Sequence, residues 1–214
     1  MKSVLVTGGT RRLGLAISEE LRLRGWRVIT SSHRADAGAD IIADLSQPAA
    51  AAKLYLKALG LEPDLAAIVN NAALFTGEES ALRTVNLESA KKLTMLLAGR
   101  EEAKCAVVNV LDAEVLAAGD AAADAGKAAY LVTKRELLEY TRKSACLFAD
   151  TLRVNAVAPG PVMAPEGVHE KAAEILLDRR PTAQDVACAV AFLLEAESVT
   201  GAVLPVDSGQ HLLY

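Results

Sequence analysis

Residues 6–14 read VTGGTRRLG and connect a short apolar run, residues 2–6, to a segment with helical spacing, residues 15–25. A glycine-rich turn between a strand and a helix lets backbone N–H groups approach a diphosphate, and the helix N-terminus adds partial positive charge. Because glycines also permit tight packing alone, this stretch leaves two interpretations open: a structural turn, or a binding site for a phosphate-bearing cofactor.

Short β-branched runs alternate with longer helical patterns along the rest of the chain. The runs span residues 4–6, 28–30, 41–42, 66–69, 106–110, 152–157 and 202–206, and the helical patterns span 12–24, 48–59, 79–100, 127–148 and 182–194. This alternation predicts an α/β fold with a single doubly wound (Rossmann) domain over residues 1–214. We expect a parallel seven-stranded sheet with helices on both faces. The alanine-rich residues 117–125 are predicted to form a loop.

Composition argues against several classes of partner. The net charge is −4 and only 4% of residues are aromatic, so we expect no nucleic-acid partner. No apolar run approaches the ~20 residues that span a bilayer, and the first residues do not resemble a signal peptide. Three scattered cysteines fit buried thiols in a reducing cytoplasm. His169 and His211 lack ligand-spaced partners, so we expect no metal.

The second strand ends in a cluster that bears on cofactor choice. Residues 31–34 read SSHR, where an NAD-selecting enzyme usually places a carboxylate to accept hydrogen bonds from the ribose 2′-OH. A guanidinium fork suits a 2′-phosphate instead, and Arg11 or Arg12 is in reach to assist. The cluster therefore predicts NADPH/NADP+ as the cofactor, the alternative being that Arg34 is a solvated loop residue.

Taken in chain order, the motifs resemble those of the short-chain dehydrogenase/reductase family. They are TGGTRRLG (7–14), ADLS (43–46), IVNNAA (68–73), TVNLESA (84–90), VVNVLD (107–112), YLVTK (130–134), RVNAVAPGPV (153–162) and VTGAVLPVDSG (199–209). With the turn and the second strand, the resemblance implies cofactor-binding roles for Gly8, Thr10, Arg11, Arg12, Leu13, Gly14, Ser32, His33, Arg34, Asp44, Leu45, Asn71, Ala72, Lys134, Pro159, Gly160 and Val162. It implies catalytic roles for Asp112, Tyr130, Lys134 and Asn86.

Four features are similar to the pteridine reductase branch of that family. Arg12 replaces the middle glycine of the turn, His33-Arg34 follows the second strand, Phe75 lies shortly after Asn71, and Asp112 stands where most members have serine. The resemblance implies that Arg12 contacts cofactor phosphate, that Phe75 stacks on a flat pterin, and that Asp112 relays protons with Tyr130. The implied substrate-binding residues are Phe75, Ala73, Asp112 and Tyr130.

Tyr130 and Lys134 lie one helical turn apart, so their side chains share a face. A nearby ammonium is expected to lower the phenol pKa from about 10, so that Tyr130 supplies a proton while hydride passes to a C=O or C=N carbon. Asp112 can donate a hydrogen bond only when it is protonated. The alternative is that Asp112 merely replaces the catalytic serine of the family and has no catalytic role. Asn86 holds a water or a backbone group, or lies on the surface. Phe75 stacks on substrate or is plain core.

Three functions remain open at this point. The first is an NADPH-dependent reductase of a dihydropterin or dihydrofolate. The second is a 3-oxoacyl-thioester or other carbonyl reductase, and the third a non-catalytic NADP(H)-binding regulator. A short spacing between Asn71 and Asn86, a short segment after Gly160 and a long one before Tyr130 depart from the family and leave the substrate open.

The family resemblance also implies a homotetramer or homodimer that pairs the Tyr130-bearing helix with the helix before it. Leu131, Leu138 and Phe148 either form an apolar face for this pairing or belong to the core.

Overall fold

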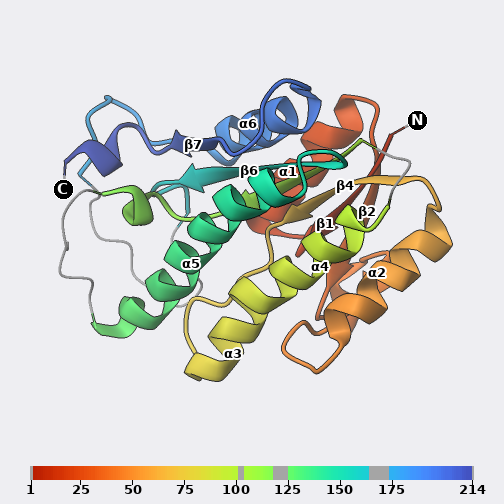
Figure 1. Cartoon of the computed structure of the whole chain (residues 1–214). Helices are drawn as coiled ribbons and strands as arrows, with labels where there is room; N and C mark the ends of the chain where they lie inside the picture. Colours follow the sequence, from red (N-terminus) through yellow and green to blue (C-terminus); the bar gives the residue numbers. More distant parts are fainter. Residues whose placement is uncertain (1, 101–103, 118–124, 164–173, 214) are drawn as a thin grey trace.

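The structure, a computed structural model, describes residues 2–100, 104–117, 125–163 and 174–213. Within these ranges a parallel sheet has seven strands in the order β3-β2-β1-β4-β5-β6-β7 (Figure 1). The strands are β1 (Ser3–Thr7), β2 (Arg27–Ser32), β3 (Ile41–Ile42), β4 (Leu65–Asn70), β5 (Cys105–Val110), β6 (Leu152–Pro159) and β7 (Val203–Val206). Strands 1 to 3 run outward to one edge, and strands 4 to 7 run to the other. The predicted doubly wound fold is therefore confirmed.

The helices lie on both faces of the sheet (Figure 1). Helices α1 and α6 pack against each other on one face, and α2, α4 and α5 cover the other. Their bounds are α1 (Arg12–Leu23), α2 (Ala50–Leu61), α3 (Glu79–Arg83), α4 (Ser89–Ala98), α5 (Ala125–Leu147) and α6 (Ala183–Glu195), with single turns η1 (Ala35–Ala37), η3 (Ala113–Leu116) and η4 (Gln210–Leu212).

Strand β1 shows why the strands are apolar without alternation. Val4 and Val6 pack into the core cluster under α1 and α6, whereas Leu5 between them packs into the cluster under α2 and α4. All three side chains are fully buried. Because successive side chains of a strand point to opposite faces, a sheet covered on both sides needs apolar residues at every position.

The predicted helix over residues 79–100 forms with an interruption. Helix α3 and helix α4 are joined by a π-helical turn, Thr84–Glu88, which contains Asn86. Such turns widen a helix by one residue and occur often at functional sites. Asn86 is buried within this turn, and its contacts are described below.

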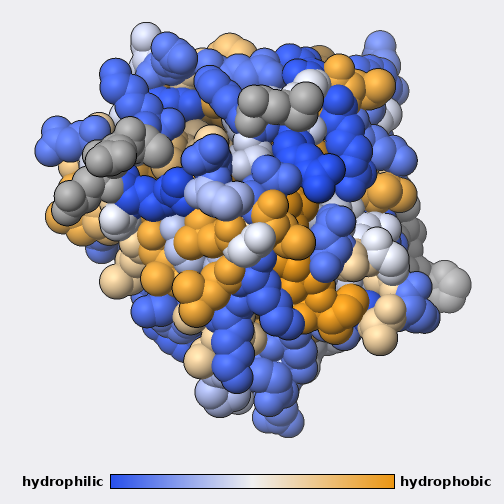
Figure 2. Space-filling view, turned by 90° about the vertical axis from the view of Figure 1, so that its right-hand side faces the viewer, coloured by the Kyte–Doolittle hydropathy of each residue, from blue (hydrophilic) through white to orange (hydrophobic). Residues whose placement is uncertain are grey.

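The outer surface combines polar and apolar side chains. Figure 2 shows apolar side chains gathered in the middle of one face, with hydrophilic side chains around them. Exposed leucines include Leu56 and Leu61 of α2. Leu131 and Leu138 are buried core residues, and Phe148 packs against the core, so the structure supports the core interpretation of these three. No helix in the described ranges is both long and apolar enough to cross a membrane. Most of the predicted loop 117–125 lies outside the described residues.

Candidate functional site

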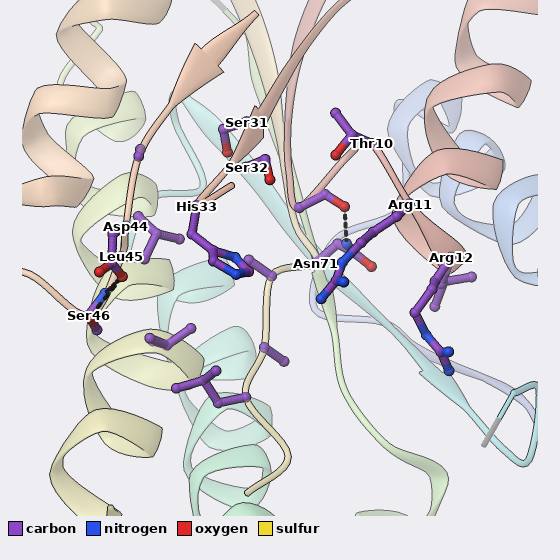
Figure 3. Close-up of a pocket in the computed structure, with 18 residues that line it drawn as sticks. Thr10, Arg11, Arg12, Ser31, Ser32, His33, Asp44, Leu45, Ser46 and Asn71 are labelled. Carbon is purple, nitrogen blue, oxygen red and sulfur yellow. Dashed lines mark hydrogen bonds between the residues drawn. The ribbon is translucent and has the colours of Figure 1, made fainter. Parts of the chain in front are cut away.

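A cavity of about 350 Å³ lies at the carboxyl ends of β1, β2 and β4. This is the point where strand order reverses, and ligands of doubly wound sheets bind there. Figure 3 shows Thr10, Arg11 and Arg12 on one side of the cavity, Ser32, His33 and Asp44 on the other, and Asn71 between them. The lining residues are Gly8, Thr10, Arg11, Arg12, Leu13, Gly14, Ser31, Ser32, His33, Ala43, Asp44, Leu45, Ser46, Asn71, Ala72, Ala73, Leu74 and Val85.

The turn after β1 is packed so closely that a Cβ at Gly9 or Gly14 would overlap neighbouring atoms. A Cβ on Gly14 would lie 2.0 Å from the carbonyl oxygen of Gly8 and 2.6 Å from Asn71 Nδ2. Asn71 Nδ2 donates to the Thr7 carbonyl at 2.9 Å, and the Asn71 and Ala72 amides donate to Thr7 Oγ1 at 3.0 and 2.9 Å. The ends of β1 and β4 are therefore joined by hydrogen bonds at the cavity floor.

Two further features of the turn fit a bound diphosphate. Within the described residues, the buried hydroxyl of Thr10 has no hydrogen-bond partner, and Thr10 lines the cavity, so a ligand oxygen would satisfy it. Arg12 has a left-handed backbone, with φ of 51°, at the position where the family places its middle glycine. The chain keeps the glycine conformation there and adds a cationic side chain to the cavity lining.

The end of β2 supplies the opposite wall. Ser31, Ser32 and His33 line the cavity, and Asp44 follows from the next strand. The Ser46 amide and hydroxyl donate to Asp44 at 3.0 and 2.7 Å and lower the pKa of that carboxyl. Arg34 is not among the lining residues. Its guanidinium makes a two-pronged pair with Asp36 at 3.0 and 2.8 Å on the exposed surface. Its predicted contact with a 2′-phosphate therefore requires a side-chain rotation and stays a prediction.

Sequence reasoning missed five residues of the cavity lining: Ser31, Ala43, Ser46, Leu74 and Val85. Each lies next to a predicted residue along the chain: four follow or end strands, and Val85 precedes Asn86 in the π-helical turn. Ala73, predicted for substrate, lines this same cavity.

The predicted Tyr–Lys pair lies on α5. Both residues are buried, and Lys134 Nζ donates to the Val110 carbonyl at 2.7 Å and lies 5.6 Å from the Tyr130 ring centroid. Burial lowers the pKa of Lys134 to about 8. This value leaves the amine able to gain or lose a proton near neutral pH.

The pKa of Tyr130 corrects the sequence prediction. Burial raises it well above its usual value, and the neighbouring Asp112 carboxylate adds to this by charge and by a hydrogen bond with the phenol. The prediction of a lowered pKa was therefore wrong, because burial outweighs any effect of Lys134, whose Nζ donates to the Val110 carbonyl.

Asp112 lies between β5 and η3. Its Oδ1 accepts a hydrogen bond from the Glu114 amide at 3.1 Å, and its Oδ2 lies 3.5 Å from Lys127 Nζ. The carboxylate therefore caps η3 and faces the phenol of Tyr130. Lys127 and Glu114 are charged residues of this site that sequence reasoning missed, because no motif includes them.

Asn86 and Phe75 take defined places beside Tyr130. Asn86 Oδ1 accepts from the Leu74 amide at 2.7 Å, and its Nδ2 donates to the Leu74 carbonyl at 2.9 Å. Of the alternatives for Asn86, the structure therefore supports the backbone contact. The half-buried Phe75 ring packs against Tyr130, with centroids 5.0 Å apart. The segment after β4 is thus fixed next to the phenol.

The remaining predicted cofactor-binding residues lie at the carboxyl end of β6. Pro159 ends β6, Gly160 and Val162 follow it, and a Cβ on Gly160 would lie 2.6 Å from Asp207 Cβ. His211 contacts the buried Asp207 at 2.6 Å. In the part of the chain that the structure describes, no group of three His, Cys, Asp or Glu residues has metal-binding geometry. His169 lies outside that part.

Comparison with known proteins decides the family. A family model described as enoyl-(acyl carrier protein) reductase matches residues 9–211. The chain belongs to the short-chain dehydrogenase/reductase family. It is 30% identical to carbonyl reductase family member 4 of Danio rerio, over 98% of each chain. It is 27% identical to a dihydromonapterin reductase of Escherichia coli, over 98% of this chain and 96% of that one.

Solved structures agree with this assignment. The chain superposes on a crystal structure of FolM alternative dihydrofolate reductase 1 from Brucella canis, complexed with NADP, with a TM-score of 0.85. The two share 28% identity, over 100% of this chain and 95% of the other. The predicted family is confirmed, and its members with similar sequences include reductases named for pterin and folate substrates, as the resemblance implied.

Proposed function

We propose that the protein is an NADPH-dependent oxidoreductase of pteridine reductase type, which reduces a C=N bond of a dihydropterin or dihydrofolate. The observation that carries the proposal is the placement of Asp112 and Phe75 against Tyr130, beside the buried Lys134. A carboxylate and an aromatic ring at these positions suit a flat, nitrogen-rich substrate. The names of relatives such as the dihydromonapterin reductase and the FolM alternative dihydrofolate reductase support the same substrate class.

The cavity residues fit NADPH, which would supply the hydride when bound. The diphosphate would lie over Gly8, Thr10 and Gly14 at the N-terminus of α1. There the buried Thr10 hydroxyl would donate a hydrogen bond to a phosphate oxygen. Arg12 and Ser32 would face phosphate groups, and Asp44 would lie beside the adenine. Pro159, Gly160 and Val162 would border the nicotinamide end.

The proton would come from the phenol of Tyr130. The Asp112 carboxylate faces that phenol, and the buried amine of Lys134, with a pKa of about 8, lies 5.6 Å from the phenol ring centroid. Asn86 fixes the backbone at Leu74 and so keeps Phe75 against the phenol. In this proposal Tyr130 is the proton donor, Lys134 is the buried amine beside its ring, and Asp112 is the carboxylate that faces its hydroxyl.

One relative favours a second candidate function. The similarity to carbonyl reductase family member 4 extends over nearly the whole of both chains. Reduction of a C=O group would use the same Tyr130 and Lys134, but it would not require a carboxylate at the position of Asp112.

A substrate panel tests the proposal. The protein is mixed with NADPH and dihydrobiopterin, dihydrofolate, acetoacetyl thioesters or quinones, and absorbance at the NADPH band is followed. We expect turnover with the pterin or folate. Turnover with thioesters or quinones alone would favour the carbonyl reductase, and NADPH binding without any oxidation would favour a regulator.

We also propose a homotetramer, with a homodimer as the alternative, in the cytoplasm. Three residues support pairing through α4 and α5: Met95, Val132 and Leu147 are exposed there. The three cysteines have free thiols, which is consistent with a reducing compartment, although only Cys105 is buried as expected, whereas Cys146 is exposed and Cys188 is half-buried. Sedimentation equilibrium at micromolar concentration tests the assembly, and a monomer would contradict it.

A further inference from the structure

Lys127 brings a second ammonium group to the candidate catalytic centre. It lies one turn before Tyr130 on α5, so the two side chains share a face of the helix. Its Nζ lies 6.0 Å from the Tyr130 ring centroid and 5.8 Å from the Phe75 ring centroid. Lys127 therefore faces the same space as the phenol and the aromatic ring.

The ammonium of Lys127 bridges two carboxylates of one short segment. It donates a hydrogen bond to Glu114 Oε1 and lies 3.5 Å from Asp112 Oδ2. The three side chains are only 18–30% exposed, in contrast to the Lys143–Glu139 pair on the same helix, which is 69–78% exposed. Because partly buried charges are screened less by solvent, the Lys127 bridge is the stronger of the two interactions.

This bridge fixes the orientation of Asp112. The Glu114 amide donates to Asp112 Oδ1, and the Lys127 ammonium lies 3.5 Å from Oδ2, so each oxygen has its own partner. Glu114 ties Lys127 back to the same η3 turn. Without the ammonium, Asp112 and Glu114 would leave two negative charges next to Tyr130, and both already raise the pKa of its phenol.

We propose that Lys127 is a positioning residue of the reaction. Held by Glu114, it orients the Asp112 carboxylate against the Tyr130 phenol and so keeps the phenol in place for substrate. Lys127 acts through Asp112 and transfers no proton itself. This inference rests on the proposed function, because it assigns a purpose to the Asp112–Tyr130 contact.

Steady-state kinetics test the proposal with a cycle of variants. Lys127→Met is expected to lower kcat about 10- to 100-fold, because small misplacements of reacting groups have effects of this size. NADPH affinity is expected to stay unchanged, and Lys127→Arg is expected to retain most of the activity. Glu114→Gln should give a smaller loss in kcat. Lys143→Met, the matched control on α5, should leave kcat as in the unchanged protein.

The decisive comparison is made in an Asp112→Asn background. If Lys127 acts through Asp112, Lys127→Met should lower kcat no further there. An equal loss in both backgrounds, or a kcat unaffected by Lys127→Met, would overturn the proposal.

The same cycle is measured by urea unfolding, which needs no substrate. The shifts in midpoint of Lys127→Met and Asp112→Asn should not add if the two side chains interact. If no substrate is reduced, the proposed function fails, yet additive midpoint shifts would still reject the Lys127–Asp112 interaction on their own.

Discussion

The cofactor half and the catalytic half of this protein are built in different ways. The cavity for the proposed cofactor is formed by short chain segments at strand ends, where glycine spacing and backbone hydrogen bonds set the geometry. The catalytic half depends on side chains from β5, η3 and α5 that meet through charge and burial. The first type of site is formed by contiguous sequence motifs, whereas the second is formed by contacts between residues that are distant in the sequence. Substitutions should therefore have different consequences in the two halves.

The largest effect is expected from Tyr130→Phe, which removes the proton donor and leaves the ring. We expect kcat to fall by about 10²- to 10⁴-fold, with NADPH affinity unchanged. Tyr140→Phe is the matched control, because that hydroxyl on the same helix contacts the Lys91 carbonyl at 3.3 Å. Stopped-flow kinetics and NADPH fluorescence titration measure the two quantities. If Tyr130→Phe weakens NADPH binding as strongly as it lowers kcat, the separation of the two halves is wrong.

In the cofactor half, Gly14→Ala should destabilise the whole fold. Its Cβ would overlap the Gly8 carbonyl, so we expect a loss of about 3 kcal/mol in the free energy of unfolding, together with weaker NADPH binding. Gly60→Ala is the control: its Cβ would meet nothing within 4 Å, and alanine should stabilise α2 by up to about 1 kcal/mol. Urea unfolding measures both, and equal effects of the two substitutions would contradict the packing argument.

Lys134 gives the catalytic half a pH-dependent stability. Its pKa is depressed to about 8 in the folded chain, so the unfolded chain binds more protons between that value and the usual one near 10.5. Stability from this group should therefore rise with pH, by about 2 kcal/mol between about pH 7 and about pH 9.5. Lys134→Met should remove this rise, whereas Lys143→Met should retain it. If the unchanged protein, Lys134→Met and Lys143→Met all show the same pH dependence of stability, the pKa of Lys134 is not lowered in the folded chain.

The smallest effect is expected from Arg34→Ala. A charge-assisted hydrogen bond to a 2′-phosphate is worth about 1.5–3 kcal/mol, so NADPH binding should weaken at least about 10-fold more than NADH binding. Arg27→Ala is the control, because Arg27 starts β2, the strand that precedes Arg34, and pairs with Glu62 at 2.8 Å, far from the cavity. Isothermal titration with both cofactors measures the ratio. An equal loss for NADPH and NADH would assign Arg34 to its surface pair with Asp36.

The sequence by itself determined the strand–helix alternation, the glycine turn at residues 8–14 and the chain order of the family's motifs. These features are local. Gly8 has a φ of 64°, which glycine adopts without strain, and an apolar run between two helices predicts a buried strand, so neither inference needs knowledge of distant residues. For the same reason, thirteen of the eighteen residues that line the cavity were among those predicted.

Only the tertiary structure decided the arrangement of charges around Tyr130. Lys127 and Glu114 belong to no motif, and their contact with Asp112 exists because η3 folds against the start of α5. The direction of the Tyr130 pKa shift also reversed the expectation from sequence. A YxxxK spacing places two side chains on one helix face, but burial and the groups from other elements decide which of them carries a proton.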